Sequence, residues 1–261
     1  MSGTVGQGEG LKETLLRWSF RAAETVVART TLEEKTLRDI GVDQSRIYHA
    51  SYPVDDRTFD LPTSAQRREA RDQVGLPQTA TVHLIVGKLG RRKNQEFGLQ
   101  VLSELPEDHQ LLLVGPPDGG YPTQLYREAE KLGVQSRLKI VDEHVSDVTP
   151  YYWASDTLWI PSRREGVPNV MKEALICGIP VILNEDLCIK DQVTEDDGVF
   201  HAPLDVGAFL RTVKTAINRY EVPSGRIHEV GQKRFGVSEW GEKFSKMLAD
   251  LTHLQEVENS V

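Results

Sequence analysis

Short, nearly continuous apolar segments alternate with helical patterns through most of this chain. The apolar segments lie at residues 81–86, 110–114, 138–141, 157–160 and 181–183. Runs of this length and character are typical of strands that are covered on both faces. Helical patterns stand at residues 67–74, 94–105, 123–132, 148–154, 169–177, 205–220 and 237–251. Strand and helix in this alternation predict an α/β fold built on a doubly wound parallel sheet.

The N-terminal part follows a different and shorter pattern. It predicts a helix over residues 11–23, an extended segment at 24–28, a helix capped by Thr30 or Thr31 that stops at Gly41, and another extended segment at 46–49. Residues 51–66 are polar and rich in turn formers, which is typical of a linker. We therefore divide the chain into residues 1–61, a main domain at 62–251, and a tail at 252–261.

Composition excludes several classes of protein. The 261 residues are 39% hydrophobic, enough for a core, and the net charge of −8 gives no general attraction to nucleic acid. Two cysteines, Cys177 and Cys188, make no disulfide framework, and the seven histidines form no pattern typical of a metal site.

Targeting signals are equally scarce. The longest apolar run, residues 174–183, falls short of the ~18 residues that a membrane span needs, and the first ten residues have no hydrophobic signal core. These features predict a cytoplasmic protein. The helix at 11–23 mixes aromatic and basic side chains, which leaves peripheral contact with a membrane surface as an alternative to packing.

A cationic loop follows the first strand of the main domain. Its sequence is Gly87-Lys88-Leu89-Gly90-Arg91-Arg92-Lys93-Asn94, with four cations and two glycines. Glycines allow close backbone approach, and the cations and the following helix start attract phosphate. The alternative for this loop taken alone is a solvated basic turn. The glycine-rich segment 114–120 after the next strand is more simply a plain loop.

A second candidate site follows the strand at 157–160. Glu165 lies in a loop with Gly166, and Glu173 lies eight positions later on a helix that begins near Asn169. Free amides at a helix start suit a diphosphate, and a carboxylate such as Glu173 can accept hydrogen bonds from ribose hydroxyls. The alternative is that Glu173 merely complements the helix dipole. Parallel sheets bind ligands at the carboxyl ends of their strands, so the two loops could face one crevice.

Together these motifs resemble the family-4 type of retaining glycosyltransferase with the GT-B fold. EGVPNVMKEALICGIPVI carries a Glu-x7-Glu motif at Glu165 and Glu173, VGKLGRRKN resembles the Gly-Arg-x-x-x-x-Lys-Asn loop, and LLLVGPPDGG resembles the second strand and its turn. The match covers roughly residues 78–250 and implies the Rossmann-like, donor-binding half of such an enzyme. Residues 1–61 would then be a short α/β remnant of the acceptor-binding domain.

The resemblance implies transfer of a hexosyl unit from a nucleotide-sugar, with retention at the anomeric carbon and without metal or other cofactor. Lys88 and Lys93 would hold the diphosphate, although Lys88 replaces the usual Arg and loses its bidentate geometry. Glu165 would act at the transferred sugar and Glu173 would hold the ribose. The remaining donor-binding residues implied are Gly87, Val141, Gly166, Val167, Pro168 and Asn169.

The acceptor is not identified by these residues, beyond the expectation of a glycan or a lipid. One alternative is a nucleotide-sugar-binding subunit without activity of its own, which needs a separate chain carrying an acceptor domain. Another is a decayed fragment without a ligand, for which the unusual segment 184–191 is the hint.

Overall fold

The computed structural model describes residues 7–50, 52–187, 189 and 193–258. The chain forms two compact units, Met1–Tyr52 and Pro53–Val261, which we describe separately. Cys188 and part of the segment 184–191, both named in the sequence analysis, lie outside the described residues.

The first unit contains α1 (Gln7–Ala22), β1 (Val26–Ala28), α2 (Thr31–Asp39), the 3-10 turn η1 (Gln44–Arg46) and β2 (Ile47–His49). The two strands pair in parallel. Thr30 caps α2, because its side chain accepts a hydrogen bond from the Glu33 amide. A small core of Val26, Ala28, Leu37 and Val42 holds the unit together.

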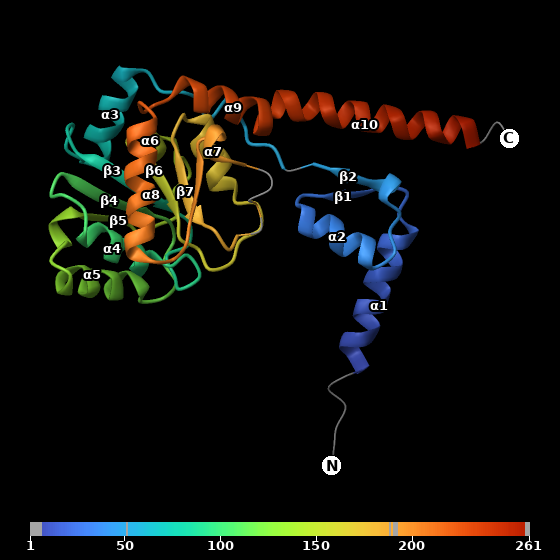
Figure 1. Ribbon diagram of the computed structural model, residues 1–261, viewed down its shortest axis with the longest axis horizontal. Helices are drawn as coiled ribbons and strands as arrows, with labels where there is room; N and C mark the ends of the chain where they lie inside the picture. Colours follow the sequence, from blue (N-terminus) through green and yellow to red (C-terminus); the bar gives the residue numbers. More distant parts are fainter. Residues whose placement is uncertain (1–6, 51, 188, 190–192, 259–261) are drawn as a thin grey trace, which may run out of the picture. The chain divides into compact units, whose positions relative to one another are not determined.

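The second unit is built on a six-stranded sheet (Figure 1). Its strands are β3 (Thr81–Val86), β4 (His109–Val114), β5 (Leu138–Val141), β6 (Thr157–Ile160), β7 (Val181–Asn184) and β8 (Val199–Ala202). All neighbours pair in parallel, in the order β5-β4-β3-β6-β7-β8. The predicted doubly wound sheet is confirmed, and β8 is an additional strand that the sequence pattern did not indicate.

Helices cover both faces of this sheet. They are α3 (Ser64–Val74), α4 (Gln95–Ser103), α5 (Tyr121–Lys131), α6 (Thr149–Trp153), α7 (Asn169–Ile176), α8 (Val206–Arg219), α9 (Gly225–Phe235) and α10 (Val237–Glu258), with 3-10 turns η2 (Gln135–Arg137) and η3 (Glu195–Asp197). The chain runs outward from β3 in one direction and from β6 in the other, so right-handed crossovers place α4 and α5 opposite α7. Consistently, α4 packs on α5 and α8, whereas α7 packs on α9 and α3 on α6.

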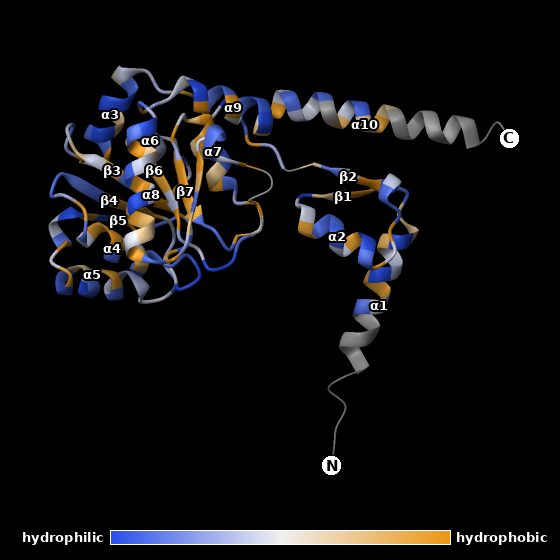
Figure 2. Ribbon diagram, viewed as in Figure 1, coloured by the Kyte–Doolittle hydropathy of each residue, from blue (hydrophilic) through white to orange (hydrophobic). Residues whose placement is uncertain are grey.

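The core lies on both sides of the strands. Leu84, Leu112 and Leu158 are fully buried, as the continuous apolar runs of the sequence predict. Figure 2 shows hydrophobic residues along the strands and hydrophilic ones on the outer surfaces of the helices. No helix among the described residues combines the length and apolar character needed to cross a bilayer.

Two boundaries differ from those expected from the sequence. Residues 53–61 belong to the second unit: Val54 bridges to Gly236, Phe59 packs edge-on against Tyr152, and the Trp153 indole donates to the Asp60 carbonyl. At the other end, α10 continues to Glu258, past the expected start of the tail at residue 252. The added residues include Leu, Gln and Glu, which are good helix formers.

Candidate functional site

The order in which the chain adds strands to the sheet reverses between β3 and β6. These two strands pair side by side although β4 and β5 lie between them in the sequence. In a doubly wound sheet this switch point opens a crevice at the carboxyl ends of the strands. The loop at residues 87–94 follows β3, and the loop at 161–168 follows β6. The topology therefore brings the cationic loop and the Glu165 loop to the same place.

Glycines allow the loop at residues 87–94 to pack closely against the turn that follows β4. Gly115, after β4, has φ of +145°, and a Cβ there would lie 2.4 Å from the Gly87 carbonyl oxygen. A Cβ on Gly87 would meet Lys93 Cε at 2.6 Å, so the lysine side chain folds back across that glycine. Asn94 ends the loop with φ of +58° and donates its side-chain amide to the Pro161 carbonyl at 3.2 Å. The two loops are thus joined directly.

An ion pair between Lys93 and Glu165 spans the switch point. The Lys93 Nζ lies 2.8 Å from Glu165 Oε1, and the two side chains are only 10% and 12% exposed. Arg92, which is more exposed, reaches the same carboxylate oxygen at 2.8 Å. Burial alone would raise the pKa of Glu165, but the hydrogen bond from Lys93 and the charges of Lys93 and Arg92 outweigh it and lower the pKa. The crevice therefore holds a carboxylate in its ionised form beside a cation.

Glu173 occupies the second turn of α7, where its carboxylate accepts a 2.6 Å hydrogen bond from the hydroxyl of Tyr152. Tyr152 comes from α6 and is fully buried, so it holds Glu173 in one orientation. Burial raises the pKa of Glu173, although the Tyr152 hydrogen bond and the charges of Lys172 and Lys93 act in the opposite direction. Sequence reasoning missed Tyr152, because a buried tyrosine on a short helix resembles ordinary core.

The start of α7 leaves room for a ligand. Pro168 stands at the N-cap and provides no side-chain cap, and a Cβ on Gly166 would meet nothing within 4 Å. Val167 and Asn169 lie on either side of Pro168, and Asn169 accepts a hydrogen bond from the Lys172 ammonium at 3.1 Å. The first amides of the helix thus point to a region where an anion can approach.

Two predicted site residues lie apart from this group. Lys88 turns away from Glu165 and pairs with Asp118 at 2.9 Å, with both side chains more than half exposed. Val141 ends β5, which is separated from β3 by β4; its carbonyl accepts from the Gly115 amide at 2.9 Å. The structure therefore brings together Lys93, Glu165 and the start of α7, while Lys88 and Val141 lie outside this group.

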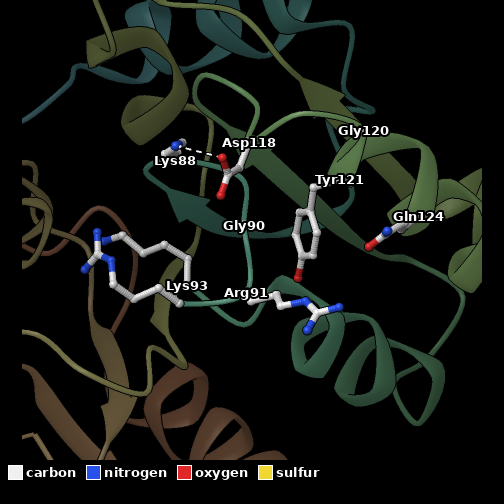
Figure 3. Close-up of a pocket in the computed structure, with 9 residues that line it drawn as sticks. Lys88, Gly90, Arg91, Lys93, Asp118, Gly120, Tyr121 and Gln124 are labelled. Carbon is white, nitrogen blue, oxygen red and sulfur yellow. Dashed lines mark ion pairs between the residues drawn. The ribbon is translucent and has the colours of Figure 1, made fainter. Parts of the chain in front are cut away.

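A cleft of about 400 Å³ opens beside the cationic loop, and Figure 3 shows the residues that line it. Arg91, Asp118, Tyr121 and Gln124 contribute to it, none of which was a predicted site residue. In the figure Lys88 is directed at Asp118. The sequence signal that was available is Gly119-Gly120 directly ahead of a helix, in the segment interpreted as a plain loop. Burial raises the pKa of Tyr121 to about 12, with nearby Glu96 adding to the shift.

Metal ligands do not gather in this region. Within the part of the chain that the structure describes, no three His, Cys, Asp or Glu side chains come close enough to hold a metal ion.

Comparison with known proteins identifies the family. Residues 66–229, more than half of the chain, match the family described as Glycosyl transferases group 1. The chain belongs to this family. The glycosyltransferase region includes both loops of the crevice, α5 and α7.

Curated relatives of this glycosyltransferase include D-inositol 3-phosphate glycosyltransferase 2 of Catenulispora acidiphila, which is 33% identical over 173 residues, 62% of this chain and 40% of the relative. The D-inositol 3-phosphate glycosyltransferase of Xylanimonas cellulosilytica is 34% identical over 197 residues, 70% of this chain and 46% of the relative. The chain thus spans less than half the length of these relatives.

Solved structures confirm the GT-B type of fold. Anabaena HepE in complex with UDP has a TM-score of 0.81 at 19% identity, covering 94% of this chain and 70% of that one. Sucrose-phosphate synthase from Thermosynechococcus elongatus has a TM-score of 0.77 at 20% identity, covering 97% and 65%. At these identities the likeness concerns the fold.

Proposed function

We propose that this glycosyltransferase binds a nucleotide-sugar at the switch point and transfers its hexosyl unit to an acceptor with retention at the anomeric carbon. The observation that carries the proposal is the Lys93–Glu165 ion pair, which places an ammonium and an ionised carboxylate where the ends of β3 and β6 meet. Membership of the family supports the transfer chemistry, and the HepE complex with UDP supports a nucleotide-sugar as donor.

Each group has a part in that reaction. Glu173, held by Tyr152, accepts the ribose hydroxyls, while Lys93 and the first amides of α7 bind the diphosphate. As the bond from the anomeric carbon to the diphosphate breaks, negative charge grows on the leaving group and Lys93 stabilises it. Glu165 stabilises the positive charge that develops on the sugar ring. Lys88 adds a second cation if its pairing with Asp118 opens.

Other predictions stay predictions. They are the contact of Val141 with the donor, the absence of a metal or other cofactor, a glycan or lipid acceptor, a separate chain with an acceptor domain, and a cytoplasmic location with or without peripheral membrane contact.

Thermal unfolding with UDP, GDP, ADP and their sugar conjugates tests the donor site directly. At a hundredfold excess over its dissociation constant, a ligand of the folded state adds about 2.7 kcal/mol to stability. We expect one nucleotide to give this shift in the wild type, and Glu173→Gln to lose most of it because the ribose hydroxyls lose a charged acceptor. Glu229→Gln is the matched control, because Glu229 is an exposed carboxylate on α9 and should leave the shift unchanged. No shift with any nucleotide would contradict the proposal.

The Tyr152–Glu173 hydrogen bond gives nucleotide binding a defined pH dependence. Since the pKa of Glu173 is raised, binding should weaken as the pH falls through a value above the ordinary glutamate range. Tyr152→Phe removes an interaction that lowers this pKa, so the midpoint of the loss should move to higher pH. Isothermal titration calorimetry with the nucleotide, repeated from about pH 4 to about pH 8, would measure this midpoint, because the range begins near the ordinary glutamate pKa and extends above it.

The control for this pair is Tyr126→Phe, which removes the hydroxyl of an exposed tyrosine on α5. Its midpoint should coincide with that of the wild type. An unchanged midpoint in Tyr152→Phe as well would show that Glu173 does not govern the titration.

A further inference from the structure

Lys172 is a buried cation at the start of α7. It is the fourth residue of the helix, and it is only 1% exposed. Both facts oppose a lysine, because burial penalises a charged group and the dipole of a helix disfavours a cation in its first turn. An ammonium in such a place needs hydrogen-bond acceptors, and the Oδ1 of Asn169 is one of them, at 3.1 Å.

The Lys172 side chain is held from two directions. Side chains on a helix lean toward its N-terminus, so Lys172 reaches back to Asn169, one turn earlier. In the other direction α7 packs on α9, and the Lys172 ammonium lies 5.9 Å from the centre of the Phe235 ring, within the range of a cation–π contact. The ammonium is thus a fixed neighbour of Asn169, which is itself exposed.

The contact with Lys172 decides which way the Asn169 amide is turned. An ammonium group only donates hydrogen bonds, whereas a side-chain amide has an accepting oxygen on one side and a donating nitrogen on the other. Asn169 must therefore present its Oδ1 to Lys172, which directs its Nδ2 away from the lysine. Within the described part of the chain, this Nδ2 donates to no other group. Because Asn169 directly follows the N-cap Pro168, the Nδ2 lies at the same helix start as the first amides of α7.

We propose that Lys172 is a positioning residue of the donor site, which orients Asn169 so that its Nδ2 donates a hydrogen bond to the diphosphate. This rests on the proposed function, in which the diphosphate lies at the start of α7. Asn169 then contacts the ligand directly, and Lys172 acts through it. The arrangement adds a side-chain donor to the backbone amides, and the partner of that donor has to be an acceptor such as a phosphate oxygen.

A second effect of Lys172 has to be separated from this one. Burial raises the pKa of Glu173, and the charge of Lys172 is among the interactions that oppose this shift. By that route, loss of Lys172 weakens nucleotide binding through the ribose instead of the diphosphate. The two routes differ in one respect, because only the first requires the side chain of Asn169.

A double-mutant cycle on nucleotide binding separates the two routes. The ligand is whichever of UDP, GDP and ADP binds the wild type, and calorimetric titration gives its affinity. We expect Asn169→Ala to weaken binding by about 5- to 10-fold, the effect of losing one hydrogen bond, and Lys172→Met to weaken it by a similar factor. In the Asn169→Ala background, Lys172→Met should cost less than about twofold.

Asn169→Asp tests the direction of the amide. The aspartate keeps an acceptor for Lys172, but it turns a second oxygen toward the phosphate in place of the Nδ2 donor. We expect it to weaken binding of the nucleoside diphosphate more than Asn169→Ala does, by about 10- to 100-fold, and to change the affinity of the nucleoside without phosphate little. Asn218→Asp is the matched control, because it adds the same charge at an exposed asparagine of α8 and should change neither affinity.

The orientation of Asn169 can also be measured without a nucleotide, by NMR relaxation of its side-chain amide nitrogen. In the free wild type this amide should be ordered. In Lys172→Met its order parameter should fall into the range of flexible groups, below about 0.6. The amide of Asn218 should relax equally in both proteins, and thermal unfolding shows whether Lys172→Met is folded.

Three results would overturn the inference. Equal losses from Lys172→Met with and without the Asn169 side chain would mean that Lys172 acts through Glu173 or through the fold. Diphosphate binding by Asn169→Asp that equals that of Asn169→Ala would place the amide away from the phosphate. An Asn169 amide that is equally mobile in the wild type and in Lys172→Met would show that the lysine does not orient it. If no nucleotide binds, the proposed function fails by itself, and the relaxation measurement still decides whether Lys172 orients Asn169.

Discussion

Replacing Lys93 by methionine should weaken binding of the nucleotide by about 10- to 100-fold, because one charged hydrogen bond to a phosphate is worth about 1.5–3 kcal/mol. Methionine keeps much of the length and volume of the side chain that crosses Gly87. The loss should be larger for the diphosphate than for the nucleoside without phosphate, whose affinity should change little. Calorimetric titration with both ligands measures the difference.

Lys131→Met is the matched control, since Lys131 is an exposed lysine at the end of α5 whose ammonium pairs with Glu128. It should leave both affinities unchanged. Lys93→Met also deprives Glu165 of its buried partner, so Lys93→Met combined with Glu165→Gln separates the two effects. If Glu165→Gln restores stability and nucleotide binding stays weak, Lys93 contacts the phosphate. Restored binding would mean that Lys93 serves only to neutralise Glu165.

The protonation of Glu165 and Glu173 makes stability and nucleotide binding depend on pH. The folded-state pKa of Glu165 is lowered, so the stability it contributes is present above its unfolded pKa and is lost as the pH falls through the lowered value. The pKa of Glu173 is raised, and its carboxylate is therefore the first of the two to be protonated on acidification. Nucleotide binding should consequently fail while the Lys93–Glu165 pair is still intact. This order arises because the neighbouring cations outweigh burial at Glu165, whereas burial outweighs the Tyr152 hydrogen bond at Glu173.

Much of this architecture was predictable because parallel strands buried on both faces leave a direct signal in the sequence. The strands at 81–86, 138–141 and 157–160 were predicted with the bounds they have. β8 was not, since Val199–Ala202 has four residues, one of them the polar His201, and follows directly after a turn ending at Gly198. Its position at the edge of the sheet is settled by pairing with β7, which is a tertiary contact.

The site was predictable to the level of loops but not of side chains. The rule that ligands bind at strand ends brought Lys93 and Glu165 to one crevice before their contact was known. The direction of Lys88 depends on Asp118, which is thirty positions away and becomes its neighbour only when β3 and β4 pair. Tyr152 and the cleft beside the cationic loop likewise depend on packing between elements. Spacing along a chain identifies motifs, and tertiary structure decides which way their side chains turn.

Removing the carboxylate of Asp156 should destabilise the second unit by about 3–5 kcal/mol, because it leaves buried cations without their partner. Asp156 lies directly before β6 and accepts from Arg67 at 2.6 Å, from Arg71 at 2.8 Å and from the Val82 amide at 2.7 Å. The Arg71 side chain is only 5% exposed. In Asp156→Ala, the midpoint of urea unfolding should fall while the slope stays close to that of the wild type.

The control is Asp196→Ala, which removes one exposed partner of Arg219 and should cost less than about 1 kcal/mol. Asp156→Asn should fall between the two, since the amide oxygen can still accept from Val82 while the charge is lost. A loss in Asp156→Ala no greater than in Asp196→Ala would mean that backbone carbonyls suffice for these arginines, since Arg71 also donates to Ala154, Gln78 and Ala80. A large loss would show that α3 is fastened to the sheet by a charge cluster, at the edge opposite to the one that carries the site. Such an anchor keeps the β3–β6 junction fixed, and the Lys93–Glu165 ion pair depends on that junction.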